Sequence, residues 1–95
     1  MEKQIFEVYK KIALKFGFLN PMEKNDWRLI AELSKGFGKL VDYMNEGKRD
    51  FLTTDFCEAW CIIEREELDE MEFYAELRDL CKELEKLLKE HRMEE

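Results

Sequence analysis

Residues 55–92, DFCEAWCIIEREELDEMEFYAELRDLCKELEKLLKEHR, decide how many helices this 95-residue chain contains. The apolar residues of this stretch recur at helical spacing, and it holds no glycine or proline. A single helix of this length would extend for about 60 Å at 1.5 Å per residue, which is much longer than a small domain is wide. We therefore expect a break near Leu68-Asp69, with Asp69 as the cap of the next helix. Four helices are the preferred prediction, and three, one of them very long, are the alternative.

The helix after this break is predicted to bury one continuous stripe. Residues of the stripe follow one another at intervals of three or four, which places them on the same face. They are Met71, Tyr74, Leu77, Cys81, Leu84, Leu88 and His91, with Leu80 and Leu87 widening the stripe.

The first helix is predicted to run from Glu2 to Phe16. Its apolar stripe is formed by Ile5, Val8, Tyr9, Ile12 and Phe16. Gly17 suits the left-handed position that often ends a helix, and Phe18 would then fold back over Ala13.

The second helix has two predicted starts. Asn20-Pro21 combines a capping side chain with a proline at the first helical position, whereas Asn25 or Asp26 could cap a later start. From there to Met44 the predicted stripe consists of Trp27, Ile30, Phe37, Val41 and Met44, flanked by Leu33 and Leu40.

Glycines and short polar residues mark the ends of this segment. Gly36 and Gly38 lie inside it, which indicates close approach by a neighbouring helix or a local break. Gly47 is predicted to end it, as Gly17 ends the first helix. The third helix is expected to start at one of three adjacent caps, Thr53, Thr54 or Asp55.

Together these helices predict an all-α fold. We expect residues 1–95 to form a single domain, a small antiparallel helical bundle.

The distribution of charge argues against nucleic acid binding. The net charge is −7, made up of +2 in residues 1–50 and −9 in residues 51–95. A nucleic acid backbone requires clustered positive charge, and Lys10, Lys11 and Lys15 provide only a small basic edge. We expect this edge to be a solvated face that pairs with the acidic half.

The composition also bears on location. No apolar run approaches the roughly 20 residues needed to cross a bilayer, and the first residues lack the apolar centre of a signal peptide. The three cysteines form an odd number, which a closed disulfide framework would not use. We expect a cytoplasmic protein.

The composition also predicts a source adapted to heat. Charged residues make up 41% of the chain and asparagine and glutamine are scarce, as in heat-adapted proteins.

Cys57 and Cys61 are separated by one helical turn. Their Cβ atoms would be about 5–6 Å apart on one helix face, too far for a disulfide in a regular helix. A structural zinc site would need four ligands, and Cys81 and His91 lie too far apart to reach one ion together. We therefore interpret the two thiols as buried core residues. A metal site shared between two chains is the minor alternative.

The carboxylates of residues 64–79 form the other candidate site. Glu67-Leu68-Asp69-Glu70 and Glu76-Leu77-Arg78-Asp79 faintly resemble the ExxE and ExxD motifs of the all-helical nucleotide pyrophosphatases of the MazG type. The resemblance implies a Mg²⁺ site that acts on a nucleotide phosphate. The preferred interpretation is a solvated acidic face.

No catalytic, cofactor-binding or metal-binding residue is predicted. His91 is the only histidine and Ser34 the only serine, so a nucleophile–histidine pair is not expected. The preferred function is a non-enzymatic protein that acts through protein–protein interaction or self-association. As a homodimer, it would use part of the 56–63 surface or the row Phe73, Leu80 and Leu87. The alternative is the Mg²⁺-dependent hydrolase. We expect no membrane partner.

Overall fold

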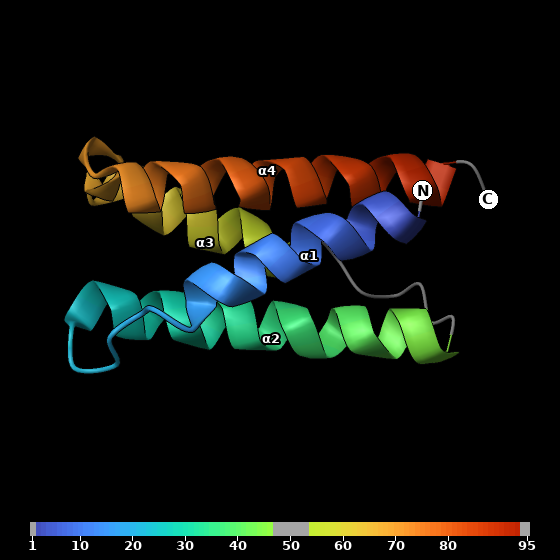
Figure 1. Ribbon diagram of the computed structural model, residues 1–95, viewed down its shortest axis with the longest axis horizontal. Coiled ribbons are helices and arrows are strands. Elements are labelled where there is room, and N and C mark those ends of the chain that lie inside the picture. Colours follow the sequence, from blue (N-terminus) through green and yellow to red (C-terminus); the bar gives the residue numbers. More distant parts are fainter. Residues whose placement is uncertain (1, 47–53, 94–95) are drawn as a thin grey trace.

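The computed structural model describes residues 2–46 and 54–93, and in these ranges the chain forms four α-helices and no strand. Successive helices run in opposite directions, and α1 crosses obliquely in front of the others (Figure 1). The fold is therefore the predicted all-α bundle, with the preferred count of four helices. Its extents are 38 × 20 × 20 Å. The elements are α1 (Glu2–Phe16), α2 (Lys24–Glu46), α3 (Thr54–Arg65), a short 3-10 turn η1 (Leu68–Glu70) and α4 (Glu72–Met93).

The predicted break between the third and fourth helices is present, but its details differ. Glu67 adopts a left-handed conformation at φ 56° and ψ 30°, and Met71 is extended. The chain reverses direction between these two residues. Asp69 is not the predicted cap, because it lies inside η1 and its side chain pairs with Arg78.

The end of α1 was predicted only in part. The helix has the predicted bounds, and Ile5, Val8 and Ile12 are buried. Gly17, however, has no positive φ, and the chain leaves the helix through tight turns. Phe18 does not fold back, because its side chain is 80% exposed; the next residue, Leu19, is buried in its place.

The start of α2 lies three residues beyond Pro21. The Asn20 side chain accepts the backbone N–H of Met22 at 3.0 Å, and the Asn20 carbonyl accepts that of Glu23 at 3.0 Å. These bonds make residues 20–23 a turn, in which proline fits without a backbone N–H. The helix begins at Lys24, so neither predicted start is correct.

The buried face of α2 is rotated from the predicted stripe. Trp27 is 61% exposed and Val41 is 43% exposed. Leu33 and Leu40, which were predicted to flank the stripe, are instead at the centre of the buried face. This face consists of Asp26, Leu29, Leu33, Gly36 and Leu40. The side chain of Met44 lies outside those that the structure describes.

Aromatic rings fill the space between α1 and α2. The ring of Phe37 lies edge-on to Tyr9 at 5.1 Å and to Phe16 at 5.4 Å between centroids. Phe56 of α3 extends the cluster, 6.1 Å from Phe37. Such edge-to-face pairs stabilise beyond the area that they bury.

The stripe of α4 largely matches the prediction. Leu77, Cys81, Leu84 and Leu88 are buried. Met71 is an exception at 61% exposed, because it precedes the helix. Gly47 and Thr53 lie outside the described residues, and the side chains of Thr54, Asp55 and His91 lie outside the described side chains. None of the helices in residues 2–46 and 54–93 has the length and apolar character needed to span a bilayer.

Candidate functional site

An open groove of about 850 Å³ lies between α1 and the first half of α4. Its apolar lining comes from both helices and from the segments next to them. Leu14 and Phe18 contribute from the α1 side, and Met71, Phe73 and Leu80 from the α4 side. A groove of this size and character is large enough to hold the side chains of a docked helix.

Large apolar side chains of this groove face solvent. Leu14 is 70% exposed, Phe18 80% and Met71 61%. Monomeric soluble proteins rarely leave large apolar side chains gathered in this way, and such patches mark interaction surfaces. Met22 and Trp27, at 89% and 61%, lie in the adjoining turn and the first turn of α2.

One ion pair spans the groove between its two helices. Lys15 Nζ lies 2.6 Å from Glu76 Oε2 and 4.9 Å from the centroid of the Phe73 ring. The hydrogen bond from Lys15 lowers the pKa of Glu76 from its ordinary value. The contact fixes α1 against α4 at this level.

A buried carboxylate forms part of the groove wall. Asp26 is 5% exposed, and it accepts a hydrogen bond from the Tyr74 hydroxyl at 2.5 Å and one from the Asn20 backbone at 2.9 Å. Burial, followed by the hydrogen bond to Asp26, raises the pKa of Tyr74 to about 12. Because Asp26 bonds to both the turn and α4, its arrangement suits a structural role.

The two rims of the groove carry opposite charges. Lys11 and Lys15 lie on the α1 side, whereas Glu76, Asp79 and Glu83 lie on the α4 side. Lys11 and Glu83 are both exposed, and within the described parts of the chain neither forms an ion pair. The groove therefore has one unpaired charge of each sign along its edges.

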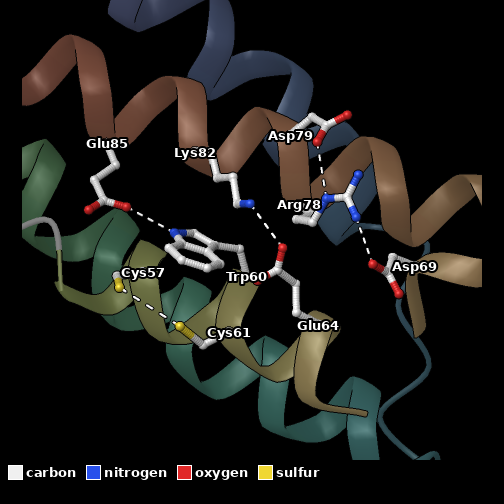
Figure 2. Close-up of polar contacts among 9 residues, drawn as sticks. All are labelled: Cys57, Trp60, Cys61, Glu64, Asp69, Arg78, Asp79, Lys82 and Glu85. Atoms are coloured by element: carbon white, nitrogen blue, oxygen red, sulfur yellow. Dashed lines mark hydrogen bonds and ion pairs between the residues drawn. The ribbon is translucent and has the colours of Figure 1, made fainter. Parts of the chain in front are cut away.

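The thiol pair lies on α3 (Figure 2), which contributes no residue to the groove. Cys57 and Cys61 are free, and their sulfur atoms are 3.9 Å apart. Burial, followed by the hydrogen bond with Cys61, raises the pKa of Cys57 to about 11. The absence of a disulfide between them matches the prediction.

The predicted burial of both thiols is wrong in part. Cys57 and Cys61 are half-buried, whereas the distant Cys81 is fully buried. The reason is that α3 turns its other side to the core, through Phe56, Ala59, Ile62 and Ile63. Residues 56–63 are thus covered on fewer sides than their composition indicates.

Polar contacts join α3 to α4 beside the thiols. The Trp60 indole N–H donates to Glu85 at 2.9 Å, and Lys82 lies above the Trp60 ring at 4.5 Å from its centroid. Lys82 also pairs with Glu64 at 2.9 Å, as Figure 2 shows. These contacts use polar groups of α3 and α4 to hold the two helices together.

The carboxylates of residues 64–79 do not converge. Glu67 and Glu70 are exposed in the connection before α4, while Glu76 pairs with Lys15. Asp69 and Asp79 both accept hydrogen bonds from Arg78, at 2.7 and 3.1 Å (Figure 2). The side chains that the structure describes contain no group of three or more His, Cys, Asp or Glu suited to a metal ion.

Comparison with family models, curated proteins and solved structures finds no match for this chain.

The groove was not predicted from the sequence. Helical periodicity assigns apolar residues to a core, so it hides those that point outward. Phe18 and Met22 gave the available signal, because they are large apolar residues in the turn between two helices. Phe73 and Leu80 of the predicted dimer row do line the groove, and both are half-buried.

Proposed function

We propose that this protein is non-enzymatic and acts by docking a protein partner in the groove between α1 and α4. The observation that carries the proposal is the exposure of Leu14, Phe18 and Met71 around that groove. Helices of protein partners bind such grooves through apolar residues at helical spacing. The charged rims would orient the partner and exclude chains of the wrong charge pattern.

The chemistry of the described side chains supports a non-enzymatic role. Asp26 and Glu76, two of the carboxylates that line the groove, each have a hydrogen-bonding partner within the chain. The Cys57 thiol, with its raised pKa, is a weak nucleophile at neutral pH. The two carboxylates hold helices together, and no observation on these groups favours the Mg²⁺-dependent hydrolase that the sequence left as the alternative.

A cytoplasmic location also belongs to this proposal. Three free cysteines fit a reducing compartment, where thiols are kept from pairing. A source adapted to heat remains a prediction from composition.

Site-specific photo-crosslinking in the native host tests the docking function. A photoreactive residue at position 14 should form a protein adduct, and Phe18→Ser should abolish it by removing the exposed ring beside that position. The control carries the same residue at Ser34, which is exposed on α2 away from the groove, and should give no adduct. Equal labelling at both positions, or none at position 14, would refute the docking function.

A further inference from the structure

We infer that the groove's partner is a second copy of this chain, related by a two-fold axis along the groove, with each Lys11 facing the other copy's Glu83. The inference rests on the proposed docking function and deepens it by naming the partner. Closed two-fold dimers are the commonest assemblies of soluble proteins, and they require a surface that is complementary to itself.

The charges of the rims make this surface self-complementary in one orientation. Rotation about an axis along the groove places the α1 rim of one copy over the α4 rim of the other. Lysines then face carboxylates on both sides. Rotation about an axis across the groove would instead place Lys11 near Lys11 and Glu83 near Glu83, which is unfavourable.

The positions of Lys11 and Glu83 along the groove agree with this orientation. The Lys15–Glu76 ion pair aligns α1 with α4, which run in opposite directions (Figure 1). Lys11 lies one turn before Lys15, and Glu83 two turns after Glu76, so both are displaced to the same side of that pair. Rotation about a two-fold axis along the groove leaves the position of each residue along the groove unchanged. It therefore brings Lys11 of one copy near Glu83 of the other.

The apolar residues match in the same orientation. Leu14 and Phe18 project from the α1 side, and Phe73 and Leu80 lie on the α4 side. The rotation covers the exposed α1 pair of one copy with the half-buried α4 pair of the other. Each copy would bury the large side chains that the single chain leaves in solvent.

Sedimentation equilibrium with charge reversals tests the inference. The unaltered chain should dimerise at micromolar concentration. K11E and E83K should each weaken their own dimer roughly tenfold or more, because each change creates two like-charge contacts. A mixture of the two variants should form a heterodimer about as strong as the original dimer, and the double variant K11E/E83K should dimerise again.

The dimers of the single variants separate this orientation from an axis across the groove. With an axis across the groove, like charges meet in the dimers of the unaltered chain, of K11E and of E83K alike, so neither change would weaken its own dimer, and the mixture would associate more tightly than the unaltered chain. K86E, a reversal on exposed α4 surface outside the groove, is the matched control and should leave the dissociation constant unchanged.

Three results would overturn the inference. They are a monomer throughout the micromolar range, single variants that dimerise as tightly as the unaltered chain, and a failure of the mixed variants to associate. If position 14 then crosslinks to a different protein, the docking function stands and only the second-copy partner is lost. If position 14 crosslinks to nothing, both proposals fail.

Discussion

The ring of Phe56 in α3 occupies the space that a side chain at Gly36 of α2 would need. A Cβ atom on residue 36 would lie 2.9 Å from Phe56 Cζ, so the Phe56 ring, which is 1% exposed, would have to shift within the core. Gly36 thereby allows α2 and α3 to approach closely. We expect Gly36→Ala to lower the free energy of unfolding by roughly 1–3 kcal/mol, the usual cost of overpacking a core. Urea denaturation of the two proteins measures this change in the free energy of unfolding.

Gly38 provides the matched control for this substitution. It lies on the same helix, and an added Cβ would meet nothing within 4 Å. Gly38→Ala should therefore stabilise the protein by up to about 1 kcal/mol, the difference in helix propensity. Equal effects of the two substitutions would show that helix propensity alone governs both positions.

Glu67 is a non-glycine residue in the left-handed region, at φ 56°. A side chain at this conformation costs roughly 1–2 kcal/mol, which glycine does not incur. We expect Glu67→Gly to raise the free energy of unfolding by about 0.5–1 kcal/mol, since glycine's greater freedom when unfolded offsets part of the gain. Thermal denaturation measures the change. Glu66→Gly, in the turn beside it, is the control and should not stabilise.

The sequence predicts what depends on local periodicity and misses what depends on how the helices face one another. Ile5, Val8 and Ile12 share one face of α1 in any packing, so their burial was predictable. The face that α2 buries depends on where α1 and α3 lie, and one residue of rotation exposes Trp27 while burying Leu29. The groove depends on the separation of α1 and α4, which no local pattern encodes.

Tyr74 gives a prediction for alkaline pH. Its folded pKa is about 12 against an ordinary 10.0, so its contribution to stability is complete below pH 10 and is lost as the pH rises through 12. Tyr74→Phe should cost about 1.5–3 kcal/mol near neutral pH, because Asp26 then loses a charged hydrogen bond. The difference from the unaltered protein should shrink between pH 10 and 12. Denaturation at several pH values measures it, and a constant difference would contradict the raised pKa.

Cys57 should react slowly with thiol reagents in the native protein. Raising its pKa from 9.0 to about 11 lowers the thiolate fraction near neutral pH by about 100-fold, and the thiolate is the reacting form. We expect alkylation by iodoacetamide, followed by mass spectrometry, to be slower than that of an unstructured cysteine peptide by about tenfold, because a thiolate of higher pKa is more nucleophilic and this offsets part of the loss. The same protein in denaturant is the control and should react at the peptide's rate. Rapid labelling of native Cys57 would reopen a chemical role for the thiol pair.

Divalent cations should leave the melting temperature unchanged if the carboxylates of residues 64–79 are structural. Asp69 and Asp79 hold Arg78, and Glu76 holds Lys15, so a metal ion would have to displace these cations from their ion pairs. If a Mg²⁺ site existed, a Mg²⁺ concentration of 100 times its dissociation constant would stabilise the fold by about 2.7 kcal/mol, which thermal denaturation detects easily. The measurement compares Mg²⁺ and Mn²⁺ with an equal ionic strength of sodium chloride, because salt alone weakens exposed ion pairs. A rise that appears only with the divalent ions, and that Glu76→Gln and Asp79→Asn remove, would favour the hydrolase over the docking protein.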